Sequence, residues 1–180
     1  MNTFIALLRG INVSGQKKLP MADLRSMLEK MDFKDTSTYI QSGNAVFSSH
    51  KNDTHALEDE IRRHIQRTFG FDVPVLVKSK ADFEKIFRKN PFKDAEALEK
   101  NQVYFILLKN TPDKEKRIAL QKEIYKTEKF AIEDDCVYLL CENGYGKAKF
   151  NNNLVERKLK VKATTRNYRT MARLWEMAGK

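Results

Sequence analysis

The segment Thr164–Arg169 has the residue types and the spacing of a binding site for an anion. The apolar spacing of the residues that follow predicts a helix over Thr165–Ala178, with Thr164 or Thr165 as its N-cap. Backbone N–H groups at a helix start, a hydroxyl and guanidinium groups are the donors that a phosphate or a carboxylate requires. We therefore predict an anion site at this helix start, formed by Thr165, Arg166 and Arg169.

Positive charge at the start of a helix is unusual. It opposes the helix macrodipole and costs about 0.3–1 kcal/mol for each exposed cation. Lys160 and Lys162 add to it just upstream, and no acidic residue follows until Glu176. A bound anion would explain this charge. Alternatively, the arginines pair with carboxylates elsewhere, such as Glu133 or Asp135, and no ligand is involved.

The segment Arg9–Lys18 is a second candidate. Its two glycines and its lysines resemble a phosphate-binding P-loop, but Gln16 stands where that motif requires lysine, so a nucleotide-hydrolysing loop is excluded. The segment nevertheless follows the carboxyl end of a central strand, where ligands of α/β proteins commonly bind. We predict Arg9, Asn12 and Lys17 as ligand contacts; an ordinary solvated connection is the alternative.

The segment Asn143–Lys149 is the third candidate. Its glycines allow backbone amides to turn towards a ligand, and Lys147 and Lys149 with Tyr145 suit a phosphate or a stacked base. Part of the segment also has the pattern of a helix entry with Asn151 as the cap. We predict Lys147 and Lys149 as anion contacts.

The overall charge agrees with an anionic partner. The formal net charge is +10 and the sequence pI is about 9.5. The last 39 residues hold ten Lys and Arg against three acidic residues, which is +7 of that total. Nucleic acid, a phosphorylated metabolite and an acidic protein are all compatible with such a charge.

No catalytic set is recognisable in the sequence. The three histidines lack metal-like partners, and no serine or cysteine has the context of a nucleophile. We expect no metal site and no cofactor. Cys136 and Cys141 fall on opposite faces of one expected strand, which disfavours a disulfide between them. The longest apolar run has six residues, which is too short to span a membrane. We therefore expect a cytoplasmic protein with no membrane partner.

The hydrophobic pattern predicts an α+β fold of two tandem ferredoxin-like modules. The apolar run Phe4–Leu8 does not alternate with polar residues, which indicates a central strand buried on both faces. Residues 1–79 follow the order strand-helix-strand-strand-helix-strand. A helical linker is expected over 80–100, and a second module over 101–180 begins with the strand 102–109. This module resembles the first but shows no fourth strand, so we expect a modified copy that ends in basic helices.

Three motifs stand out in the sequence: Ala6–Val13, Tyr39–Asn44 with Phe47, and Ala163–Thr170. In combination they resemble the motifs of a bacterial family, the domain of unknown function (DUF) 1697 family. The resemblance extends over essentially the whole chain and implies a cytoplasmic bacterial protein with a compact two-part α+β fold. It implies no activity. Its polar motif residues include two further candidates for the binding site: Asn44 and Asn167.

Three hypotheses about function remain open. The first is a module that binds an anionic ligand, either nucleic acid or a phosphorylated small molecule, on a basic face. The second is an enzyme for a small phosphorylated or carboxylated substrate, oriented by Arg166, Lys147 or Lys17. The third is an interaction domain for an acidic protein. The aromatic motif of RNA-recognition domains is missing, which favours electrostatic binding within the first hypothesis.

Overall fold

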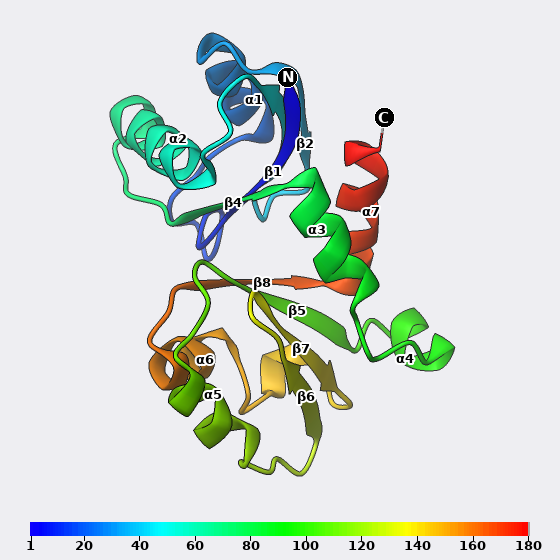
Figure 1. Cartoon of the computed structure of the whole chain (residues 1–180). Helices are drawn as coiled ribbons and strands as arrows, with labels where there is room; N and C mark the ends of the chain where they lie inside the picture. The colour runs from blue at the N-terminus through cyan, green and yellow to red at the C-terminus, as the bar shows by residue number, and fades with distance from the viewer. Residues whose placement is uncertain (180) are drawn as a thin grey trace. The chain divides into compact units, whose positions relative to one another are not determined.

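The computed structural model describes residues 1–179, which form two compact units (Figure 1). Unit 1 comprises Met1–Lys85 and the end of the chain from Leu174, and unit 2 comprises Ile86–Arg173. Each unit contains a four-stranded antiparallel sheet with two helices packed on one face. The prediction of two tandem ferredoxin-like modules in an α+β fold is confirmed. The predicted linker 80–100 contains two helices, α3 (Lys80–Arg88) and α4 (Ala95–Glu99).

Unit 1 is organised around its first strand. Its strands pair in the order β2-β3-β1-β4, with these bounds: β1 Asn2–Leu8, β2 Lys34–Tyr39, β3 Asn44–Ser49 and β4 Val75–Ser79. The side chains of Phe4–Leu8 are all at most 2% exposed, which confirms a central strand buried on both faces. Alternate residues of this run pack with α1 (Met21–Lys30) and α2 (Thr54–Phe69). The Asp53 carboxylate caps α2 by accepting hydrogen bonds from two backbone N–H groups.

Unit 2 repeats this arrangement around β5. The strand order is β6-β7-β5-β8, with these bounds: β5 Val103–Leu108, β6 Glu128–Ile132, β7 Cys136–Cys141 and β8 Ala163–Asn167. Apolar residues of β5 pack with α5 (Lys114–Gln121) and α6 (Asn152–Leu159). A short 3-10 helix, η1 (Tyr145–Lys147), follows β7, and α7 (Tyr168–Ala178) follows β8 directly.

The expectation that the second module lacks a fourth strand is wrong. Residues 163–167 form β8, which pairs with β5 so that Thr164 faces Leu107 and Arg166 faces Phe105. Pairing with residues 163–167 satisfies the backbone N–H and C=O groups along one edge of β5. The β-branched threonines in this segment favour a strand conformation. The last helix therefore begins at Tyr168, three residues after the predicted start at Thr165.

The predicted cap of the last helix is also wrong. Asn167, and neither of the two threonines, caps α7: its side-chain oxygen accepts a hydrogen bond of 2.9 Å from Thr170 N–H. Asparagine is among the strongest N-cap residues. Unit 1 has the same direct connection between a strand and a helix. Ser79 ends β4, and its hydroxyl accepts a hydrogen bond from Asp82 N–H at the start of α3. Both modules thus end in a strand that runs directly into a capped helix (Figure 1).

The two central strands are anchored in the same way at their carboxyl ends. In unit 1, Leu8 N–H donates to Gly43 O in the β2–β3 turn, and Arg9 N–H donates to Pro74 O before β4. In unit 2 the equivalent bonds run from Leu108 to Asp135 and from Lys109 to Lys162, each 2.8 Å long. The loops that leave each central strand therefore start from a fixed position.

Replacing the cap of α7 tests this description of the last segment. Asn167→Ala removes the acceptor for Thr170 N–H, so we expect the free energy of unfolding to fall by about 1 kcal/mol. A urea titration followed by circular dichroism measures the change. Asn167→Ser, which restores a capping oxygen, serves as the control and should recover most of the loss. Equal stability of the alanine variant and the wild type would contradict the assignment.

Candidate functional site

The predicted arginine cluster at a helix start does not form. Arg166 lies in β8 and is 8% exposed, and its Nη1 donates a hydrogen bond of 2.9 Å to Thr165 O. Burial lowers the pKa of this guanidinium to about 10. Arg169 lies in the first turn of α7, exposed, and its Nη2 donates to the backbone carbonyl of Glu99. The two side chains therefore belong to different elements. The prediction that both lie at the start of one helix is wrong.

Thr165 has a structural contact instead. Its hydroxyl donates to Asn152 Oδ1 at 2.9 Å and accepts from the Tyr145 hydroxyl at 3.2 Å. The Tyr145 oxygen also accepts from Asn152 N–H at 2.9 Å. This network ties the segment 143–149 to the start of α6 and to β8. Two of the candidate segments thus meet within unit 2, with Tyr145 held by the fold and in ring contact with Tyr104.

In unit 1 the segment 9–18 forms a small hairpin whose base is held by Asn12. Asn12 Nδ2 donates to Leu19 O and Gln41 O at 2.9 Å each, and Asn12 Oδ1 accepts from Leu19 N–H at 2.8 Å. Asn12 also has a φ of 55°, a conformation that asparagine tolerates better than most residues. Lys17 is exposed, and its Nζ donates to Asp72 O. Asn12 therefore shapes the loop, whereas Lys17 lies on its surface.

Asn44 and its turn are packed tightly against the same loop. The Asn44 side chain is buried and donates to Tyr39 O at 2.8 Å and to Ser42 Oγ at 3.1 Å. Gly43 has a φ of 84°, and a Cβ there would lie 2.6 Å from a methyl carbon of Ile11. Only glycine allows this approach. The asparagines at 12 and 44 thus fix the β2–β3 turn and the neighbouring loop.

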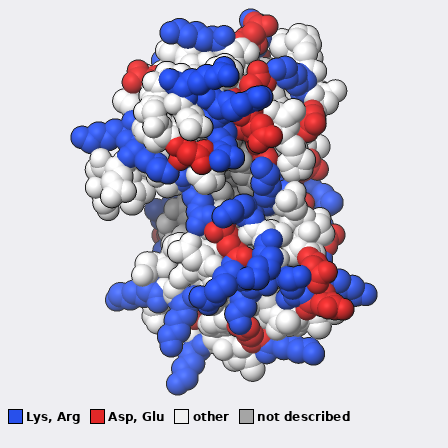
Figure 2. Space-filling view, turned by 90° about the vertical axis from the view of Figure 1, so that its left-hand side faces the viewer, with Lys and Arg blue, Asp and Glu red and all other residues white. Residues whose placement is uncertain are grey.

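Most of the net charge of the protein belongs to unit 2. Residues 86–173 contain 20 Lys and Arg against 12 Asp and Glu, a net charge of +8 out of the total of +10. In the lower part of Figure 2, Lys and Arg side chains gather over α5 and α6 of unit 2. Three of the cations here are in ion pairs, namely Lys116 with Asp113, Arg117 with Asp134 and Lys158 with Glu123.

Four other cations form what we call the basic end of unit 2. They are exposed, and no carboxylate of residues 1–179 lies within 4.0 Å of them: Lys114, Arg157, Lys160 and Lys162. They lie at the start of α5, at the end of α6 and before β8. The chain brings these points to one end of the sheet, because Lys109 at the end of β5 is bonded to Lys162 O.

The helix dipoles act differently on these cations. The end of α6 is its negative pole, so Arg157 is placed favourably there without any ligand. Lys114 is at the positive pole of α5, where a cation is disfavoured. Asp113, which caps α5 by accepting from Glu115 N–H and Lys116 N–H, offsets part of that cost. Lys114 was not among the predicted contacts, although the sequence shows a lysine directly after the capping residue Asp113.

Residues 1–138 match the family described as Protein of unknown function (DUF1697). The chain belongs to the DUF1697 family. The matched range includes two of the family-like motifs, at 6–13 and 39–47, and ends before the third at 163–170. The description of the family states no activity.

A solved structure shares the fold. The conserved bacterial protein SP0830 from Streptococcus pneumoniae has a TM-score of 0.74 and 23% sequence identity, covering 98% of each chain. No curated protein matches the chain. Among residues 1–179, no helix combines the length and the apolar character that a membrane span requires.

A substitution separates the structural role of Asn12 in this DUF1697 protein from a ligand contact. Asn12→Ala removes three hydrogen bonds at the base of the hairpin, so we expect a loss of about 1–3 kcal/mol of unfolding free energy, measured by urea titration. Gln16→Ala, at the exposed tip of the same hairpin, is the matched control and should leave stability unchanged. A stable Asn12→Ala variant would show that the amide does not hold the loop.

Proposed function

We propose that this DUF1697 protein binds a phosphate-bearing ligand, a single-stranded nucleic acid, at the basic end of unit 2. The observation that carries this proposal is the gathering of four exposed cations that have no carboxylate of residues 1–179 within 4.0 Å. Charges this exposed contribute little to folding. They do attract a polyanion, because each phosphate that they neutralise releases condensed counterions.

The aromatic side chains of unit 2 favour recognition of phosphates over stacking of bases. The Phe105 ring of β5 is in contact with Phe87 and Tyr168, at centroid distances of 6.1 and 6.5 Å. The Tyr138 hydroxyl of β7 donates to Ile86 O at 2.8 Å. These central-strand rings are therefore used by the fold, whereas RNA-recognition domains leave theirs available for bases. The proposed binding has little sequence preference.

The other candidate residues have different parts in this proposal. Lys147, Lys149 and Arg169 are exposed in unit 2 and extend the positive surface, while Arg9 and Lys17 supply cations in unit 1. Buried or bonded side chains position the segments that carry these cations: Asn12, Asn44, Thr165, Arg166 and Asn167. The free, buried cysteines at 136 and 141 support a reducing compartment, and we propose the cytoplasm.

The proposal predicts a steep dependence of binding on salt. For the full chain and a fluorescent single-stranded oligonucleotide, the logarithm of the association constant should fall linearly with the logarithm of salt concentration. If Lys114, Lys160 and Lys162 each contact a phosphate, their replacement by Gln should reduce the magnitude of that slope by about 2. Fluorescence anisotropy over a series of salt concentrations measures both quantities.

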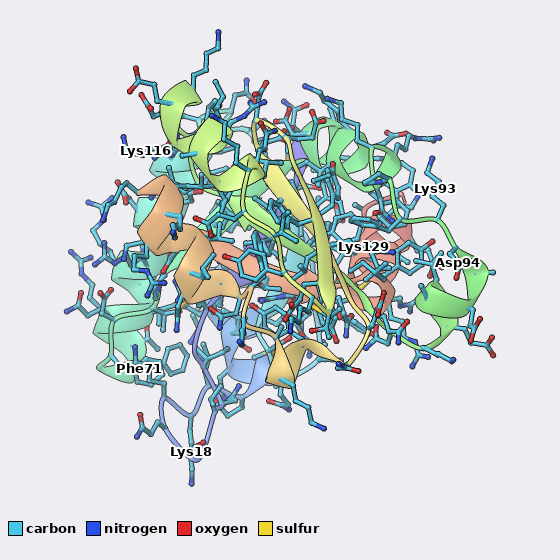
Figure 3. All side chains as sticks on the ribbon, turned by 90° about the horizontal axis from the view of Figure 1, so that it is seen from below. Lys18, Phe71, Lys93, Asp94, Lys116 and Lys129 are labelled. Atoms are coloured by element: carbon cyan, nitrogen blue, oxygen red, sulfur yellow. The ribbon has the colours of Figure 1, made fainter. Side chains whose placement is uncertain are left out.

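The matched control removes three cations from another part of unit 2. Lys93, Lys122 and Lys126 are exposed, and they too have no carboxylate of residues 1–179 within 4.0 Å. Lys122 and Lys126 follow the end of α5, whereas the basic end is at its start. Figure 3 shows Lys93 and Lys116, which lies on α5, on opposite sides of the unit. Replacing Lys93, Lys122 and Lys126 by Gln changes the net charge equally and should lower the slope much less. Equal slopes for the two triple variants would mean that net charge alone attracts the probe, and would refute a site at the basic end.

A further inference from the structure

A small cavity in unit 2 contains a buried carboxylate that the proposed function does not use. The cavity has a volume of about 370 Å³, and its lining includes Glu128, Cys141, Asn143 and Lys147. Glu128 is 6% exposed. It is the first residue of β6, a strand whose side chains alternate between the two faces of the sheet. Glu128 therefore lies on the same face as Ile132, which is buried in the core of unit 2. The strand therefore places an acidic group where an apolar one is expected.

This carboxylate is not neutralised by the described part of the protein. Its Oε1 accepts a hydrogen bond of 2.8 Å from Lys149 N–H. No Lys, Arg or His nitrogen of residues 1–179 lies within 4.0 Å of it. An ionised carboxylate that is removed from water without a cation destabilises the fold unless something else compensates. A carboxylate that lines a cavity is compensated when a positively charged group enters.

A basic residue, Lys147, also lines this cavity. Lys147 belongs to η1, and its exposed ammonium group is more than 4.0 Å from the Glu128 carboxylate. The segment that carries it is fixed by the bonds between Tyr145, Thr165 and Asn152. A cavity whose lining includes a buried acidic residue and a basic residue that is not paired with it complements a ligand that carries an ammonium group and a carboxylate on the same carbon atom. The volume lies within the usual range for small-molecule sites, about 300–1,000 Å³.

We propose that this cavity binds a small zwitterion of the α-amino acid class, with its ammonium group against Glu128 and its carboxylate against Lys147. The amide of Asn143 and the hydroxyl of Thr127, which also line the cavity, offer further polar contacts. This site shares no residue with the four cations of the basic end, although Lys147 also belongs to the wider positive surface of unit 2.

The lining disfavours other ligand classes. A phosphate would be repelled by the Glu128 carboxylate. A metal ion would lack ligands, because no group of three His, Cys, Asp or Glu among residues 1–179 is placed to hold one. Burial raises the pKa of the Cys141 thiol to about 12, so this sulfur stays protonated at neutral pH and acts neither as a thiolate ligand nor as a nucleophile.

The test uses the full chain, labelled with ¹⁵N, and three probes: free alanine, N-acetylalanine and alaninamide. We expect free alanine to shift the backbone amide signals of residues 143–149 in a saturable way. N-acetylalanine lacks the ammonium group and alaninamide lacks the carboxylate, so each should bind at least about tenfold more weakly. No shift with free alanine, or equal shifts with all three probes, would overturn the proposal.

Two substitutions assign the two charges to their residues. Glu128→Gln keeps an acceptor for Lys149 N–H but removes the charge, and Lys147→Gln changes an exposed side chain that folding does not require. Each should weaken alanine binding at least about tenfold. Lys129→Gln, the adjacent exposed position in β6, is the control and should bind as the wild type. If Glu128→Gln does not fold, the Lys147 variant still decides the outcome, because unchanged affinity there contradicts the proposal.

Discussion

Burial of a central strand on both faces is the constraint on which the rest of the structure depends. On one face, the side chains of β1 and β5 pack against the helices of their unit. On the other face, the apolar side chains of these two strands are buried as well. Such a strand has no side chain left for a ligand. Polar and charged groups can therefore gather only at its ends, where the chain leaves the sheet and where both modules fix the exit with two backbone hydrogen bonds.

The two modules differ in the segments that surround the carboxyl end of the central strand. In unit 1 it is followed by a hairpin tied down by Asn12 and by the tightly packed turn at Gly43. In unit 2 the equivalent turn contains Asp134 and Asp135, and the exit is surrounded by lysines from the start of α5 and the end of α6. Net charge thus accumulates on one copy of the fold while the topology stays the same.

The sequence was sufficient for the elements that local pattern determines. The unbroken run Phe4–Leu8 identified a doubly buried strand, and the order of elements predicted for residues 1–79 is the order found in unit 1. It was insufficient for residues 163–167, because two local signals conflicted there. Threonines suit a cap and a strand equally, and the pairing with β5, more than 50 residues earlier, decides between them. That contact is not visible in a local window.

The candidate site divides in the same way. The exposure of Lys17, Lys147 and Lys149 follows from their loops and was predictable. The role of Asn12 depends on Gln41, which lies 29 residues away, and could not be deduced from spacing. The inward position of Glu128 could be predicted from the sequence, because the alternation of side chains in β6 places it on the same face as Ile132.

A chemical-shift titration of the full chain tests most directly whether the exit of β5 is a binding surface. A short single-stranded oligonucleotide is added to ¹⁵N-labelled protein at low salt, and the perturbed backbone amides are mapped. Binding at the basic end predicts shifts concentrated at residues 109–116 and 157–163. Shifts spread evenly over exposed lysines of both units, or no shifts at all, would contradict it.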